Sequence, residues 1–170
     1  MAINWFRQIL FFLILLILQV WIFNKIHILG VATPLFYIYY ILKLPVNTNR
    51  NIVLILSFLM GFFLDMFAYS YGFHMLACTM AGFTRHYAFR LFLPKELVEF
   101  DIPSIKDFGV GLFFRYIVSI VLIHHIVFFT VESLSLFDPL RLLYCIFGSA
   151  VLTIVLIFAA EGLTFSNIKK

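Results

Sequence analysis

The sequence predicts an all-α integral membrane protein, a six-transmembrane-helix bundle that forms one polytopic domain over residues 1–170. Of the residues, 64% are hydrophobic and only 12% are charged, against about 25% charged residues in ordinary soluble domains. Apolar runs follow one another along the chain, and the segments between them are shorter than the roughly 50 residues that a soluble domain needs. These observations together predict a membrane protein without a separate soluble domain.

Each apolar run is judged against the roughly 20 helical residues that cross about 30 Å of hydrocarbon. The first run begins and ends near Trp5 and Trp21, which are about 24 Å apart along a helix, so one indole is expected near each interface. No small-residue cleavage site follows Val20, which favours a retained span over a removed signal peptide. The six predicted spans are residues 5–23, 33–45, 51–68, 73–93, 105–131 and 139–160.

The second run is the shortest. Thr33 and Pro34 have the pattern of an N-cap followed by a first-turn proline, but Pro45 limits the predicted helix to about 17 Å. Such a helix crosses the bilayer only if it continues past Pro45 or if the bilayer thins. The remaining starts are better marked, because Ser104 precedes Asp107 in a capping-box pattern and Asp138 precedes a proline. Pro94 is expected to close the fourth run.

The distribution of Lys and Arg favours an N-terminus and a C-terminus in the cytoplasm. With six spans, only two cations fall outside, Lys25 and Arg141. A re-entrant second run with an outside N-terminus exchanges Arg7 for Lys25 and gives the same count, so this alternative stays open for the first half. The formal charge of +4 is too small to indicate nucleic-acid binding.

Asp65 is the most informative single residue, because a carboxylate inside an apolar run costs several kcal/mol unless it is paired or hydrated. It lies just before a short turn, and His74 follows that turn at a similar depth, with Gly72 between them. The two side chains are expected either to pair and lock the hairpin or to present a polar contact to a partner helix; the alternative is a hydrated Asp65. Gly61 and Gly82 each follow a small residue by four positions, which favours close helix packing.

Other polar residues in the apolar runs have structural interpretations. His74, Cys78, Gly82 and His86 recur every four residues and form one stripe, which predicts a packing seam, with a small-molecule pocket as the alternative. Adjacent His124 and His125 are about 100° apart around a helix and poorly suit joint chelation, so no metal and no cofactor is expected. Arg115 is expected to snorkel inward or to meet Glu161.

No catalytic motif stands out in the sequence. The apolar runs contain no paired acids within one turn, and the chain has no glycine-rich phosphate loop, no His-Glu-x-x-His motif and no nucleophile motif. The acids of the loop near 95–107 are expected to form a hydrated cytoplasmic connector, with partner docking as the alternative. These observations favour a protein that is not an enzyme.

The pattern resembles the rod shape-determining MreD family of small bacterial inner-membrane proteins. The resemblance rests on the proline that opens the second run in Ala32-Thr33-Pro34-Leu35, on the aromatic residues 35–41 that follow, and on the hairpin with Gly61 and Asp65 before the turn and Gly72 and His74 after it. The high Phe content and the long acidic loop depart from the family pattern.

The resemblance implies a non-enzymatic scaffold of the cell-elongation machinery in the bacterial cytoplasmic membrane. Such a scaffold binds the single-span protein MreC and, through it, helps to couple MreB filaments to RodA and a penicillin-binding transpeptidase of peptidoglycan synthesis. The family fold is similar to the substrate-binding subunits of energy-coupling-factor transporters, a likeness of architecture alone. The alternative from another class is a vitamin-binding membrane subunit of an importer; an enzyme acting on lipid has the least support.

Overall fold

The computed structural model describes residues 5–28, 30–92, 102–135 and 138–167, and within this part the chain folds almost entirely into helices. Five α-helices are long, and one short α-helix lies between the first two of them. In chain order the α-helices are α1 (Trp5–Trp21), α2 (Ile38–Lys43), α3 (Arg50–Ala68), α4 (Phe73–Phe92), α5 (Ile105–Glu132) and α6 (Pro139–Asn167), with short 3-10 helices η1 (Phe23–Lys25) and η3 (Ser133–Ser135).

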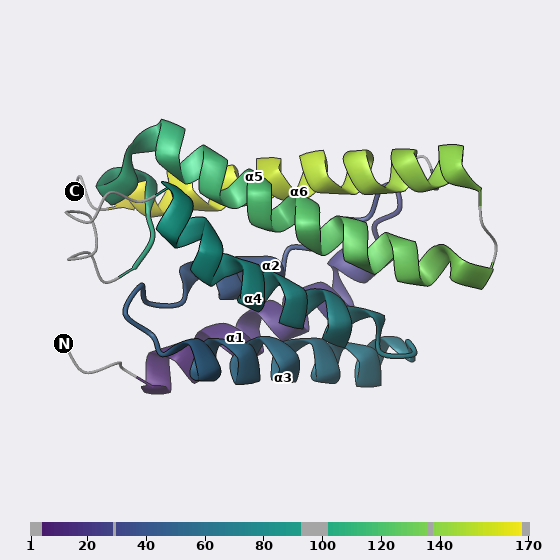
Figure 1. The fold of residues 1–170 in the computed structure, drawn as a ribbon, viewed down its shortest axis with the longest axis horizontal. Coiled ribbons are helices and arrows are strands. Elements are labelled where there is room, and N and C mark those ends of the chain that lie inside the picture. The colour runs from purple at the N-terminus through teal and green to yellow at the C-terminus, as the bar shows by residue number, and fades with distance from the viewer. Residues whose placement is uncertain (1–4, 29, 93–101, 136–137, 168–170) are drawn as a thin grey trace.

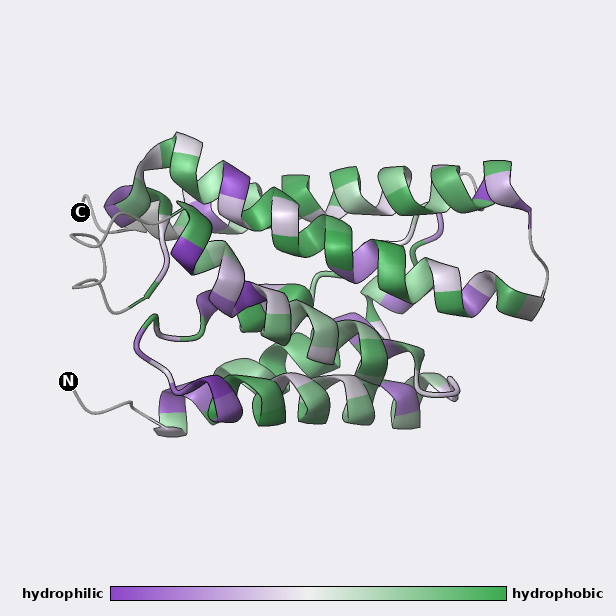
Figure 2. Cartoon of the chain, in the orientation of Figure 1, coloured by the Kyte–Doolittle hydropathy of each residue, from purple (hydrophilic) through white to green (hydrophobic). Residues whose placement is uncertain are grey.

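Four segments of the described chain are long and apolar enough to cross a membrane. They are Trp5–Lys25, Arg50–Ala68, Ile105–Glu132 and Pro139–Leu163. Figure 2 shows hydrophobic residues along most of the length of these helices, with hydrophilic residues mainly near the ends. An all-helical chain with this pattern is a multi-pass membrane protein.

The long helices run roughly parallel to one common axis (Figure 1). Helix α3 packs against α4, α4 packs against α5, and α5 packs against α6. Helix α4 therefore lies between α3 and α5. The start of α1 and the end of α6 lie at the same end of the bundle, opposite the turn that joins α3 to α4 (Figure 1). We call the end that contains the α3–α4 turn the hairpin end.

Helix α2 fills the centre of the bundle. It contacts α1, α3, α4 and α5, and its residues Ile38–Leu42 are all buried. The prediction of a helix over 33–45 that begins at Thr33 is therefore wrong, because helix begins only at Ile38 and residues 33–37 are non-helical. The second run packs inside the protein as a broken segment, a placement that allows irregular backbone at membrane depth.

The predicted helix starts at Ser104 and Asp138 are confirmed. The Ser104 hydroxyl accepts a hydrogen bond from the Asp107 N–H at 3.2 Å, and the Asp138 carboxylate accepts one from the Leu140 N–H at 3.0 Å. Both contacts satisfy N–H groups that a helix leaves unpaired in its first turn. The predicted stop at Pro94 lies outside the described residues.

Candidate functional site

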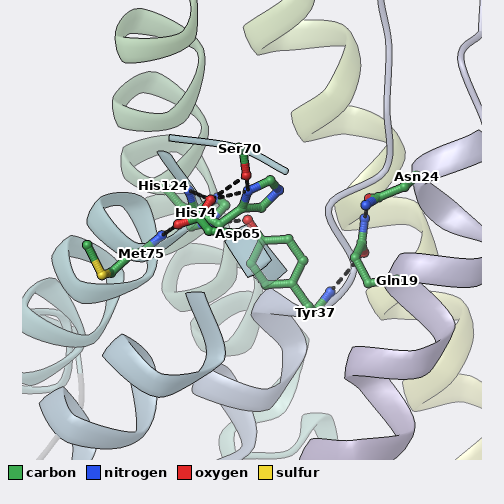
Figure 3. A network of polar contacts seen from close by, with 8 residues as sticks. All are labelled: Gln19, Asn24, Tyr37, Asp65, Ser70, His74, Met75 and His124. Carbon is green, nitrogen blue, oxygen red and sulfur yellow. Dashed lines mark hydrogen bonds and ion pairs between the residues drawn. The ribbon is translucent and has the colours of Figure 1, made fainter. Parts of the chain in front are cut away.

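The site is built around Asp65, which lies in the last turn of α3 and is 8% exposed. One carboxylate oxygen, Oδ1, accepts hydrogen bonds from the Ser70 hydroxyl at 2.5 Å, the His74 N–H at 3.1 Å and the His74 ring Nδ1 at 2.9 Å. The other oxygen, Oδ2, accepts from the Met75 N–H at 2.8 Å. Four donors therefore compensate one buried carboxylate, as Figure 3 shows.

The same carboxylate caps the next helix. His74 and Met75 belong to the first turn of α4, where backbone N–H groups have no intrahelical acceptor. Asp65 supplies that acceptor from α3, and a negative charge at a helix N-terminus is also favoured by the helix dipole. The structure thus brings together Asp65 and His74, which the sequence analysis expected at similar depth. The pair lies inside the α3–α4 hairpin and links its two helices.

The backbone of the turn makes this approach possible. Helix α3 ends at Tyr69, whose φ of 52° lies in the left-handed region, and the Tyr69 N–H bonds back to the Asp65 carbonyl. Gly72 has a φ of 91°, a conformation that side-chain-bearing residues rarely adopt. Its carbonyl then accepts the Leu76 N–H at 3.1 Å as α4 begins. The predicted importance of Gly72 therefore has a conformational basis.

Gly61 and Gly82 lie where α3 and α4 are in close contact. A Cβ added at Gly61 would meet the Met75 Cα and would lie 2.5 Å from the His74 carbonyl oxygen, both of which are backbone atoms. A Cβ at Gly82 would meet the Ser57 hydroxyl and would lie 2.9 Å from the Ser57 Cβ. The small residues let the two backbones touch, which is the role their spacing predicts.

His74 continues into a buried network with Tyr37, which precedes α2, and with residues of α5. Its ring centroid lies 5.6 Å from that of Tyr37 and 4.6 Å from that of Phe128. The Tyr37 hydroxyl forms a 2.9 Å hydrogen bond with Nε2 of His124 (Figure 3), and His125 bonds Thr153 of α6 at 3.2 Å. In the part of the chain that the structure describes, no three His, Cys, Asp or Glu side chains are grouped to hold a metal ion.

Buried polar side chains support the non-helical segment before α2. Gln19 of α1 accepts the Phe36 N–H at 2.9 Å and donates to the Pro34 carbonyl at 3.0 Å. On α6, the Ser149 hydroxyl accepts the Thr33 N–H and the Thr153 hydroxyl accepts the Leu35 N–H, each at 3.0 Å. These contacts satisfy backbone groups that would otherwise be unpaired in an apolar interior.

The far end of α2 receives the same support. The guanidinium of buried Arg85 donates to the Leu44 carbonyl and, at 3.2 Å, to the Pro45 carbonyl. The Tyr116 hydroxyl donates to the Leu42 carbonyl at 3.0 Å. The sequence analysis counted Arg85 among the cytoplasmic cations and did not predict that its side chain binds the backbone carbonyls at the end of the second run.

Glu161 forms a second buried charge site, near the end of the bundle opposite the hairpin end. Its Oε1 lies 2.6 Å from the Lys43 Nζ and also accepts the Tyr39 hydroxyl at 2.6 Å. The Lys43 ammonium donates in addition to the Pro103 carbonyl at 2.7 Å. Glu161 therefore joins α6 to α2, while the side chain of Arg115 on α5 is exposed.

We expect Glu161→Gln to lower the free energy of unfolding by about 1–3 kcal/mol, because Lys43 loses its ionic partner while Tyr39 keeps an oxygen acceptor. Thermal unfolding of the purified protein in detergent measures the loss. The double variant Lys43→Met with Glu161→Gln should recover part of it, since no unpaired ammonium remains. Equal losses in the single and double variants would contradict the ion-pair explanation.

A cavity of about 490 Å³ opens beside the Asp65 site at the hairpin end. Helices α1, α3, α4 and α5, the turn after α3 and the segment before α2 all contribute to its wall. Its polar lining residues are Asn24, His27, Thr33, Ser70, His74 and Glu132, and its aromatic ones are Phe67, Tyr69, Tyr71, Phe73, Phe128 and Phe129. The volume lies in the range of small-molecule sites.

Comparison with known proteins returns no relative: the chain matches no protein-family model, and no curated protein and no solved structure is significantly similar to it.

Proposed function

We propose that this protein is a non-enzymatic membrane scaffold of the MreD type, which binds an MreC-like single-span protein and helps to couple MreB filaments to RodA and a penicillin-binding transpeptidase. The proposal includes six membrane crossings, a likeness in architecture to the substrate-binding subunits of energy-coupling-factor transporters, and both termini on the cytoplasmic side of a bacterial inner membrane. In it, the broken second run counts as one crossing, because α2 and residues 33–37 lead from the hairpin end back to the start of α3.

The observation that carries the proposal is the set of hydrogen bonds that Asp65 accepts. Both carboxylate oxygens are occupied by donors of the hairpin itself, namely Ser70, His74 and Met75. A carboxylate with these partners shapes the bundle and is poorly placed to exchange protons with a substrate. Two of these residues, Asp65 and His74, also carry the resemblance to the MreD family, so a structural role for them supports a rigid scaffold.

Affinity purification tests the scaffold proposal. The tagged protein is extracted from its own host in a mild detergent, and the copurifying proteins are identified by mass spectrometry. We expect a single-span protein with a periplasmic coiled coil, together with cell-wall synthases. Recovery of transport ATPases in place of these proteins would contradict the proposal, as would unchanged cell shape after depletion of the protein.

A second candidate, a small-molecule-binding subunit of an importer, is favoured by one observation, the 490 Å³ cavity at the hairpin end. Cavities of this size with a few convergent polar groups are typical of ligand sites. Native mass spectrometry of the protein released from detergent distinguishes the candidates, because an importer subunit should carry one bound small molecule. Transport ATPases among the copurifying proteins would add to that evidence.

A further inference from the structure

The cavity at the hairpin end contains an imidazole that is held in one orientation and one tautomer. Both hydrogen bonds of the His74 ring use Nδ1, toward Asp65 and Ser70. A carboxylate only accepts, so Nδ1 carries the proton, and Nε2 is an acceptor when it carries none. Figure 3 shows the ring turned with its far side away from Asp65, and His74 lines the cavity.

A second acceptor enters the same cavity from α5. Glu132 lies at the last position of that helix and its side chain is exposed. His74, His27 and Arg141 are its electrostatic neighbours, and Arg141 lies outside the lining of this cavity. Of the described lining residues, Glu132 is the one carboxylate, and no Lys or Arg is among them. The charge on this wall is therefore complementary to a cation.

The remaining wall is aromatic. Phe128 packs edge-on against the His74 ring, with centroids 4.6 Å apart, and Phe129 packs at 5.1 Å against Phe128. Tyr69 and Tyr71 are 92% and 91% exposed at the turn that borders the cavity. Aromatic faces attract ammonium groups and also bury apolar surface, whereas they offer nothing to an anion.

We propose that this cavity binds a small organic cation, an ammonium group attached to an aromatic or other apolar body. Glu132 pairs with the ammonium, Nε2 of His74 accepts a hydrogen bond from it, and the rings of Phe128 and Phe129 contact the apolar body. The site deepens the importer candidate and does not rest on the scaffold proposal, because its evidence is the lining of the cavity and not a contact with a partner helix.

Three probes of one size test the charge requirement: 2-phenylethylammonium, the neutral 2-phenylethanol and the anionic phenylacetate. Binding to the full-length protein in detergent is measured by isothermal titration calorimetry. We expect the ammonium to bind and the other two to bind at least about tenfold more weakly. Equal affinity for the ammonium and the alcohol, or no heat with the ammonium at millimolar concentration, would overturn the proposal.

The variant Glu132→Gln tests whether the carboxylate of Glu132 is the group that pairs with the ammonium. It should weaken ammonium binding by about tenfold and leave the weak binding of the alcohol unchanged. The matched control is Asp138→Asn, which removes a carboxylate at the same end that does not line this cavity and keeps an oxygen to cap α6. Folding of both variants is checked by size-exclusion chromatography and thermal unfolding. Equal weakening in both variants would overturn the assignment to Glu132.

Copurification with the MreC-like partner is measured separately. The cation proposal and the scaffold proposal are therefore each contradicted by a different measurement.

Discussion

Replacing Asp65 with Leu is expected to lower the free energy of unfolding by about 3–5 kcal/mol. The carboxylate holds the Ser70 hydroxyl, the His74 ring and two backbone N–H groups of α4. Leucine leaves the two N–H groups without this acceptor, while the Ser70 hydroxyl and the His74 ring keep only their contact with each other. Each unpaired buried donor costs about 1–3 kcal/mol before relaxation. Thermal unfolding in detergent and the yield of monodisperse protein measure the loss.

A graded series separates the charge from the hydrogen bonds. Asp65→Asn keeps one acceptor oxygen and should be intermediate between wild type and Asp65→Leu. Asp107→Asn is the control, because Asp107 also lies near a helix start, and among the described residues its side chain bonds Ser104; we expect a loss of about 1 kcal/mol or less. If Asp65→Leu unfolded at the wild-type temperature, the compensation of this carboxylate by the hairpin would not matter for stability.

Gly61→Ala is expected to cost about 3 kcal/mol, even though alanine is the better helix former by about 1 kcal/mol. The added methyl group meets backbone atoms of Met75 and His74, which cannot move without separating α3 from α4. That separation also lengthens the contacts of Asp65 with the first turn of α4. The yield of folded protein and the unfolding temperature in detergent report the effect.

Gly162→Ala on α6 is the matched control for this substitution. Nothing lies within 4 Å of a Cβ added at Gly162, so only the gain in helix propensity remains, and stability should be unchanged or slightly higher. Opposite signs for the two glycines are therefore the expected result. A stabilised Gly61→Ala protein would show that α3 and α4 are not in close contact at this position.

Local signals in the sequence were sufficient for most helices. The predicted runs 51–68, 73–93 and 105–131 agree with α3, α4 and α5 within one residue at each end, because hydropathy and helix caps act over neighbouring residues. The pairing of Asp65 with His74 was also accessible, since a tight turn between two helices puts its flanking residues at one depth. The predicted seam holds in part: His74, Cys78 and Gly82 are buried, while His86 is half-buried.

The long-range partners could not be predicted in the same way. Gln19, Ser149 and Thr153 stand out only as polar residues in apolar runs, and nothing local says that they bind the backbone around Pro34. The hydrogen bonds from Thr33 and Leu35 span 116 and 118 positions of sequence, and such contacts depend on how whole helices assemble. The same holds for Glu161, because its partner Lys43 lies in the second run, where the helix was predicted wrongly.

The dependence of residues 33–37 on α6 sets an order for biosynthesis. When this segment leaves the ribosome, Ser149 and Thr153 have not yet been translated. The N–H groups of Thr33 and Leu35, which later donate hydrogen bonds to these two hydroxyls, need water as a partner until then. We therefore expect the segment to stay at the membrane surface or in the translocon until the last helix has been inserted. A chain truncated before α6 should consequently fail to hold α2 and become a substrate for membrane proteases.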